Sequence, residues 1–208
     1  MALSGRAYRA FAAPRDGLVK VHLGPGQSNH LAGWINVDAN AFSGKSRPEV
    51  WANLRHTLPF HDGTVDIFYS HHVIEHLPDS DLPRHLADMF RCLKPGGMIR
   101  IGGPNGDEAA RQFLNGNAEW FSDFPDRRTS VGGRFANFIL CRGEHLTILS
   151  RSYLEELLSN AGYVDIRPCQ PTWETTRSDL VDSAVLKLES ESTPEAPHTL
   201  ILEARKPG

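Results

Sequence analysis

Leu18-Val-Lys-Val-His-Leu23, followed at once by Gly24-Pro25-Gly26, is the stretch that decides the fold of this chain. Its first six residues form a short β-type run, and the glycines allow the backbone to turn sharply and to approach a ligand closely. A second β-type run, Trp34 to Asp38, follows after about ten residues and ends in a carboxylate, which can accept hydrogen bonds from both hydroxyls of a ribose. The pattern predicts the first two strands of an open α/β sheet.

Strand and helix patterns alternate along the rest of the chain. We expect further strands at Val65–Ser70, Met98–Ile101, Val164–Ile166 and Thr199–Ala204. Apolar residues at helical spacing predict helices within 82–93, 152–161 and 179–189, and Ser152 with Glu155 predicts a capping box for the second of them. This alternation predicts a Rossmann-like, open, mainly parallel sheet with helices on both faces.

Composition limits the class of protein. The 208 residues are 40% hydrophobic and 23% charged, which is typical of one ordinary globular domain. The net charge of −3 provides no broad basic field, so we expect no nucleic-acid partner. Met1–Pro14 has no apolar core, no run of about 18 apolar residues occurs, and Cys92, Cys141 and Cys169 show no CxxC spacing. We therefore expect a cytoplasmic protein with no membrane partner.

Residues 105–144 interrupt the regular alternation. They carry several aromatic residues without sustained periodicity, namely Phe113, Trp120, Phe121, Phe124, Phe135 and Phe138. Irregular stretches of this length inside a compact domain are usually lids or binding segments. We expect a lid or insertion on the acceptor side, although a cover over the sheet edge is equally consistent with the pattern.

The turn at Gly24 does not favour a pyrophosphate cofactor such as NAD. The complete GxGxxG pattern is absent, and the link to Trp34 is too short for a crossover helix whose N-terminus would hold phosphate.

Three longer stretches carry a family resemblance: VHLGPGQSNHLAGWINVDAN at 21–40, NLRHTLPFHDGTVDIFYSHHVIEHL at 53–77 and LADMFRCLKPGGMIRIGGPN at 86–105. In this order they resemble class I S-adenosylmethionine-dependent methyltransferases, particularly the small bacterial branch near the type-11 group. The likeness continues through residues 144–166 and into HTLILEARKPG at 198–208, which resembles the final antiparallel strand of the family. It implies a sheet of about seven strands and S-adenosylmethionine as the cofactor.

The resemblance also assigns roles to particular residues. Gly24, Pro25 and Gly26 would wrap the methionine part of the cofactor, and Asp38 would bind the ribose hydroxyls. The segment Asn53-Leu54 would meet the adenine, while Ser70 and His71 would close the site. Pro25 and Asn53 depart from the family pattern, which commonly has a small residue and an aspartate there. An asparagine oxygen can still accept a hydrogen bond from the adenine amino group.

The densest group of chemically active side chains follows Ser70. If a helix begins there, His72, Glu75 and His76 share one face, with His145 as a distant additional partner. Two imidazoles and a carboxylate are compatible with a divalent metal, although the pattern does not predict one. As a catalytic base that accepts the acceptor's proton, His145 is slightly favoured over His72. A structural role for Glu75 and His76 is the alternative.

The sequence thus predicts a methyltransferase that acts on a small-molecule acceptor, with an oxygen of a sugar or secondary metabolite as the first expectation. Two alternatives stay open: a partner subunit that binds the cofactor without catalysis, and an enzyme acting on a nucleotide-linked sugar. Neither the oligomeric state nor the identity of the acceptor follows from the sequence.

Overall fold

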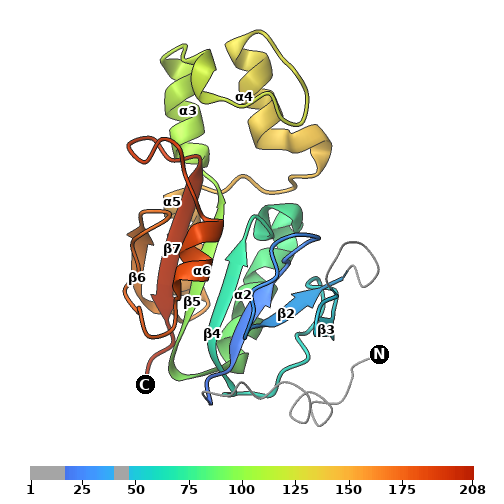
Figure 1. The fold of residues 1–208 in the computed structure, drawn as a ribbon, viewed down its shortest axis with the longest axis vertical. Coiled ribbons are helices and arrows are strands. Elements are labelled where there is room, and N and C mark those ends of the chain that lie inside the picture. Colours follow the sequence, from blue (N-terminus) through green and yellow to red (C-terminus); the bar gives the residue numbers. More distant parts are fainter. Residues whose placement is uncertain (1–16, 40–46) are drawn as a thin grey trace.

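One seven-stranded sheet forms the centre of the molecule (Figure 1). The computed structural model describes residues 17–39 and 47–208. The strands are β1 (Lys20–Leu23), β2 (Ile35–Asp38), β3 (Val50–Trp51), β4 (Val65–His71), β5 (Leu93–Pro104), β6 (Val164–Cys169) and β7 (Thr199–Arg205). Their order is β3-β2-β1-β4-β5-β7-β6, parallel from β3 to β5, with β7 antiparallel to both β5 and β6. The predicted Rossmann-like sheet with a last antiparallel strand is therefore confirmed.

Five α-helices are present in the described part of the chain. They are α2 (Leu82–Cys92), α3 (Gly106–Leu114), α4 (Val131–Leu140), α5 (Arg151–Asn160) and α6 (Ser183–Leu188). Four short 3₁₀ turns accompany them: η1 (Ile74–His76), η2 (Asp79–Asp81), η3 (Ala118–Trp120) and η4 (Cys141–Gly143). Among these helices, none is both long enough and apolar enough to cross a bilayer. Met1–Pro14, which entered the localisation prediction, lies outside the described residues.

The start of α5 corrects one prediction. The N-cap is Ser150, whose Oγ accepts a hydrogen bond from the Tyr153 amide at 3.4 Å. The capping box predicted at Ser152 is wrong, because Ser152 already lies inside the helix and Glu155 accepts a hydrogen bond from Arg151 instead. Ser150 has the extended backbone (φ −127°, ψ 159°) that a capping residue adopts.

The two faces of the sheet are covered differently. On one face, α2 and α5 contribute Leu82, Leu86, Leu154 and Leu158 to the main apolar core. On the other face, α6 and the residues before it form a smaller apolar cluster with Trp34 and Tyr69. In Figure 1, α6 lies in front of the sheet and α2 behind it. Because its apolar cluster is the smaller one, the second face also depends on polar contacts.

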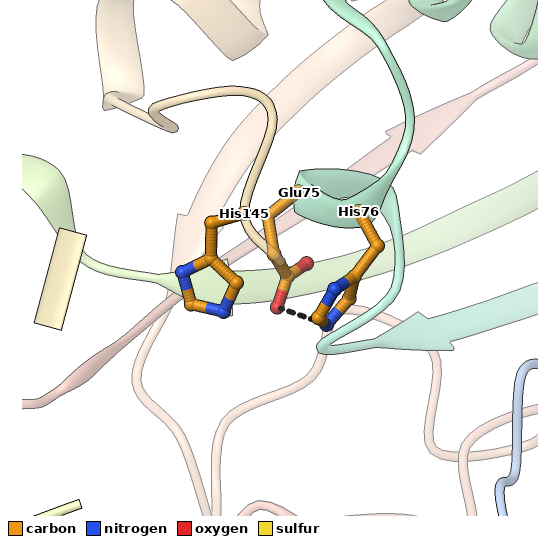
Figure 2. A group of neighbouring side chains, drawn as sticks. All are labelled: Glu75, His76 and His145. Carbon is orange, nitrogen blue, oxygen red and sulfur yellow. Dashed lines mark ion pairs between the residues drawn. The ribbon is translucent and has the colours of Figure 1, made fainter. Parts of the chain in front are cut away.

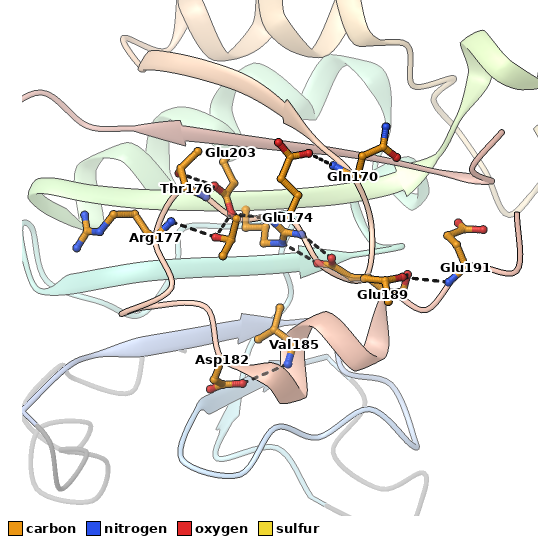
Figure 3. Close-up of polar contacts among 12 residues, drawn as sticks. Gln170, Glu174, Thr176, Arg177, Asp182, Val185, Glu189, Glu191 and Glu203 are labelled. Carbon is orange, nitrogen blue, oxygen red and sulfur yellow. Dashed lines mark hydrogen bonds and ion pairs between the residues drawn. The ribbon is translucent and has the colours of Figure 1, made fainter. Parts of the chain in front are cut away.

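A buried ion network supplements the second face (Figure 3). The Arg100 guanidinium on β5 donates to both carboxylate oxygens of Glu189, at 2.7 and 2.5 Å, and to Glu203 on β7 at 2.5 Å. Burial alone would raise the pKa of Glu203, but hydrogen bonds from Thr175 and Thr176 hold it below its ordinary value. Because removing one partner would leave a buried charge unpaired, the network ties the end of α6 firmly to the sheet.

Residues 105–144 form a helical extension beyond the carboxyl end of β5, visible as α3 and α4 in Figure 1. The extension contains its own apolar cluster of Ala109, Trp120, Phe121 and Ile139. We expected an irregular segment here, whereas α3 and α4 have nine and ten residues. The helical period was hard to recognise because the helices are short and α4 contains Gly132 and Gly133.

Candidate active site

The turn after β1 brings the backbone unusually close to a neighbouring side chain. Gly24 has a φ of +65°, and a Cβ atom there would lie 2.5 Å from Cγ2 of Val73. Its amide donates to the carbonyl of Val37 at 2.8 Å. Only glycine fits this position, because another residue would be strained at this positive φ and its side chain would collide with Val73.

Asp38 faces this turn from the end of β2. Its Oδ2 accepts a hydrogen bond from the Gly26 amide at 3.0 Å. Residues 24–34 contain no helix, as predicted from the short link. Pro25 is buried between the two glycines, and its carbonyl accepts a hydrogen bond from Asn29. The glycine turn after β1 and the carboxylate of Asp38 therefore lie together at the carboxyl ends of their strands, on one edge of the sheet.

Ser70 and His71 lie beside that edge, at the carboxyl end of β4. Ser70 is fully buried, and its Oγ has no hydrogen-bond partner within the described ranges. The same holds for Nε2 of His71, whose pKa burial lowers to about 3. A buried hydroxyl without a partner is uncommon in a folded protein and marks a place where a ligand can complete the bonding.

Asn53 and Leu54 follow β3. Oδ1 of Asn53 accepts a hydrogen bond from the Arg55 amide at 3.0 Å. Asn53 lines a polar pocket together with Arg55, His56, Thr57, Asp81 and Arg84. The side chain of Leu54 belongs to the apolar core, so Leu54 can offer a ligand only its backbone.

Trp51 is a candidate that sequence reasoning missed. It pairs with Asp38 in the β2–β3 register, and its side chain is 58% exposed. Its indole nitrogen donates to the carbonyl of Ala39 at 2.5 Å. The two-residue strand β3 is too short to give a recognisable pattern, so no strand signal in the sequence pointed to Trp51.

His72 and Glu75 form a hydrogen-bonded pair after β4. Nδ1 of His72 lies 3.1 Å from Oε1 of the buried Glu75, and Nε2 lies 3.3 Å from Oγ1 of Thr199. The predicted α-helical face is wrong, because His72 has a φ of +54° and only the 3₁₀ turn η1 follows it. The left-handed backbone at His72 directs the chain into this turn, so contact with Glu75 arises without an α-helix.

His76 and His145 approach the same carboxylate (Figure 2). One potential ligand atom each from Glu75, His76 and His145 lie within 4.8 Å of one another, and Nε2 of His76 is 4.0 Å from Oε1 of Glu75. Burial lowers the pKa of His145, which favours a neutral imidazole. The structure therefore brings together all four residues that the sequence singled out.

The backbone explains why His145 reaches a residue so distant in sequence. The carbonyl of Glu75 accepts hydrogen bonds from two successive amides, Leu146 at 2.7 Å and Thr147 at 3.1 Å. The Thr147 hydroxyl donates to the carbonyl of Leu77 at 3.0 Å. We call these three bonds the 75–147 clamp. They hold the end of the helical extension against η1.

The edge therefore has two halves, which we name after the roles that the sequence analysis expects of their residues. The cofactor half, consisting of Gly24–Gly26, Asp38, Asn53 and Ser70–His71, offers backbone turns and single acceptors. The acceptor half, consisting of His72, Glu75, His76 and His145, offers three imidazoles around one carboxylate. Such a group can accept a proton or bind a cation, depending on which ring nitrogens carry hydrogen.

Part of the chain matches a known family and a known enzyme. Residues 36–101 match a family described as a methyltransferase domain. Trans-aconitate 2-methyltransferase from Deinococcus radiodurans is 34% identical over 105 residues, which are 50% of this chain and 37% of that enzyme. The chain thus matches little more than a third of that relative's length.

Solved structures extend the likeness to almost the whole chain. A SAM-dependent methyltransferase from Archaeoglobus fulgidus has a TM-score of 0.56 at 16% identity, over 97% of this chain and 90% of the other. Phosphoethanolamine N-methyltransferase 2 from Haemonchus contortus, in complex with S-adenosyl-L-methionine, has a TM-score of 0.54 at 15% identity, over 97% and 51%. At these identities the likeness is one of fold.

Proposed function

We propose that the chain is a class I S-adenosylmethionine-dependent methyltransferase, which transfers the methyl group of this cofactor to an oxygen of a small-molecule acceptor. The observation that carries the proposal is the position of the His72–Glu75 pair at the carboxyl end of β4, directly after Ser70 and His71. Donor and proton acceptor would then share one edge of the sheet, where ligands of open α/β sheets bind.

The cofactor half fits S-adenosylmethionine. The bare backbone at Gly24 allows close approach of the methionine part, and Asp38 offers a carboxylate to the ribose hydroxyls. The unpartnered hydroxyl of Ser70 provides a further polar contact. His71 stays neutral because burial lowers its pKa to about 3, so it would not repel the positively charged sulfonium.

Trp51 adds a flat aromatic surface near the expected adenine. It lies beside Asp38 in the register and two residues before Asn53. Because an exposed indole can stack on a base, we include Trp51 among the cofactor contacts. When bound, the cofactor would supply an electrophilic methyl group; the protein supplies orientation and a proton acceptor.

The reaction requires in-line displacement. A lone pair of the acceptor oxygen forms the new bond to the methyl carbon, the bond from that carbon to sulfur breaks, and its electron pair stays on the sulfur of S-adenosylhomocysteine. The acceptor's proton must leave to a base. Holding the two reactants in line supplies much of the acceleration, and a positioned base contributes further.

The hydrogen bonding favours His72 over His145 as that base. If Nδ1 of His72 donates to Glu75, Nε2 carries the lone pair, and the carboxylate stabilises the imidazolium that forms on protonation. Thr199 can donate weakly to this Nε2 at 3.3 Å and can turn away when an acceptor binds. His145 has no carboxylate on its Nδ1, which instead contacts the carbonyl of Ile139.

The small-molecule class of the acceptor is supported by the relative whose name gives trans-aconitate as its substrate. The helical extension, residues 105–144, would cover the acceptor, since the 75–147 clamp attaches its end to the acceptor half. We therefore assign the extension to acceptor recognition.

Calorimetric titration with S-adenosylmethionine and S-adenosylhomocysteine tests this proposal. We expect binding that Asp38→Ala weakens by about 1 to 3 kcal/mol, because a buried polar partner is left unsatisfied. Asp179→Ala, which removes an exposed acid paired with Arg177, is the matched control and should leave the affinity unchanged. Absence of binding for both compounds would rule the proposal out.

A further inference from the structure

A cavity of about 310 Å³ lies where β6 and β7 meet the segment 176–177, and three arginines line it: Arg167, Arg177 and Arg205. Ligand cavities in proteins usually measure about 300 to 1,000 Å³. We propose that this cavity, which we call the arginine pocket, binds a small organic anion that carries a phosphate or carboxylate group on an apolar body. Such a site is separate from both the cofactor half and the acceptor half.

The arginine pocket lies away from the carboxyl ends of the parallel strands. Met98 lines the pocket and pairs with Arg205 at the end of β7. His71 pairs with Gly102, which lies four residues after Met98 on β5. Four residues of a strand span about 13 Å. Figure 1 shows the end of β7 beside the C-terminus, at the end of the molecule remote from α3 and α4. A ligand in this pocket would therefore leave the candidate active site free.

A β-bulge in β6 directs Arg167 into the pocket. Val164 lies opposite Arg205 and Arg167 lies opposite Glu203, so β6 advances by three residues where β7 advances by two. Side chains alternate between the two faces of a regular strand. Without the extra residue, Val164 and Arg167 would therefore point to opposite faces. The bulge turns Arg167 to the face that Arg205 and Glu203 share, and bulges often re-aim a side chain in this way next to a binding site.

Arg167 brings a positive charge that the surrounding residues do not neutralise. Its side chain is exposed and makes no hydrogen bond or ion pair with the residues that the structure describes. Glu203, which lies opposite it, already accepts hydrogen bonds from three other side chains, those of Arg100, Thr175 and Thr176. The guanidinium of Arg167 therefore keeps all of its N–H donors for a ligand.

The other two arginines are oriented by acids and keep part of their donors. Nε and Nη2 of Arg205 both donate to Oδ2 of Asp165, at 2.9 and 2.7 Å. The same two nitrogens of Arg177 donate to Asp179, at 2.8 and 2.7 Å. Nη1 of each arginine has no hydrogen-bond partner among the described residues. The three arginines outnumber the two acids, and guanidinium groups match the geometry of phosphate and carboxylate. The pocket therefore favours an anion.

The walls of the pocket are held in place by the fold. The amide and the hydroxyl of Thr176 donate to Oε2 of Glu203, at 2.7 and 2.5 Å. The Arg177 amide donates to Oγ1 of Thr175 at 3.2 Å, and Figure 3 shows the Arg177 guanidinium pointing away from Glu203. Met98, which belongs to the apolar cluster under α6, gives the pocket an apolar wall. An apolar wall beside fixed cations favours an organic anion over inorganic phosphate.

Calorimetric titration of the full chain with phenyl phosphate, benzoate and inorganic phosphate tests the site. We expect one organic anion per chain, and the tighter of the two organic probes identifies the anionic group. Inorganic phosphate should bind at least about 10-fold more weakly, because it cannot use the apolar wall. Arg167→Gln should weaken binding of the tighter probe by at least about 10-fold, as expected for the loss of charge-assisted hydrogen bonds. Because Arg167 is exposed, its substitution should leave the fold intact.

Arg151→Gln is the matched control, since it removes the same charge from an exposed arginine on α5, which covers the other face of the sheet. It should leave the affinity for the anion unchanged. Equal losses in the two variants, or absence of binding for both organic anions, would overturn the arginine pocket. Titration with S-adenosylhomocysteine separates the two proposals: displacement of the anion would also overturn the pocket, whereas anion binding without S-adenosylhomocysteine binding rejects only the methyltransferase function.

Discussion

The two halves of the candidate site are assembled in different ways. The cofactor half comes from neighbouring strands and short turns, and its bonds, such as Gly26 to Asp38, span 12 residues. The acceptor half depends on contacts that span 127 residues between His72 and Thr199 and 70 between Leu77 and Thr147. All residues of the cofactor half lie between 24 and 71, on strands that neighbour one another in the sheet or in the turns after them, whereas the acceptor half is complete only when the distant segment with His145 docks. Three predictions test this difference.

The largest effect is expected at the cofactor half, for Gly24→Ala. The new Cβ atom would lie 2.5 Å from Val73 in a backbone conformation with φ +65°. Overpacking and strain together should lower the free energy of unfolding by about 3 kcal/mol. Urea unfolding measures this loss, and titration with S-adenosylhomocysteine should show a parallel loss of affinity.

Gly26→Ala separates strain from overpacking. Gly26 also has a positive φ, but nothing lies within 4 Å of its Cβ position, so we expect a loss of about 1 kcal/mol. Combining Gly24→Ala with Val73→Ala should recover part of the lost stability, because the methyl groups in the way are removed. Equal losses for both single glycine variants would show that the contact with Val73 does not matter.

A smaller effect is expected where the helical extension meets β7. His198 stacks on Trp120 with ring centroids 4.2 Å apart, and its two nitrogens face Oε2 of Glu191 and the carbonyl of Trp120. Both partners accept hydrogen bonds, so the protonated ring satisfies both. The hydrogen bond to Glu191 raises the pKa of His198 above its ordinary value of 6.5.

The sign of the pH dependence follows from this raised pKa. Stability from the His198–Glu191 pair is complete below about pH 6.5 and is lost as the pH rises through the raised value. Glu191→Gln should lower the pKa of His198 and cost about 1.5 kcal/mol at acidic pH, with the difference from wild type shrinking at alkaline pH. NMR titration of the ring and urea unfolding measure both effects, and a pH-independent difference would contradict the assignment.

The smallest effect is expected for Thr147→Val in the 75–147 clamp. The change keeps the side-chain shape but removes the hydrogen bond to Leu77, which should cost about 1 kcal/mol of unfolding free energy. Thr64→Val, which removes a similar hydroxyl bond to the carbonyl of His61 far from the site, is the control. Only Thr147→Val should also shift the NMR signals of the His145 ring; unchanged ring signals in both variants would show that the clamp does not position His145.

The sequence predicted the sheet and most of the strands, because apolar runs between turn residues depend on local order. It also placed Gly24 and Asp38 correctly at the ends of their strands. It did not predict the two-residue strand β3 with Trp51, nor the helices at 105–144, because both elements are too short or too rich in glycine to produce a clear period.

The acceptor half shows which features follow from the sequence and which are decided only by the tertiary structure. Sequence alone singled out His72, Glu75, His76 and His145 as chemically active residues, but their geometry was assigned to an α-helix that does not form. Tertiary structure decided which nitrogen of each ring faces the carboxylate, through carbonyls at Glu144 and Ile139. Residue types and short-range patterns determine strands and turns. The orientation of a side chain in a site depends on hydrogen bonds from segments that meet only after the chain has folded.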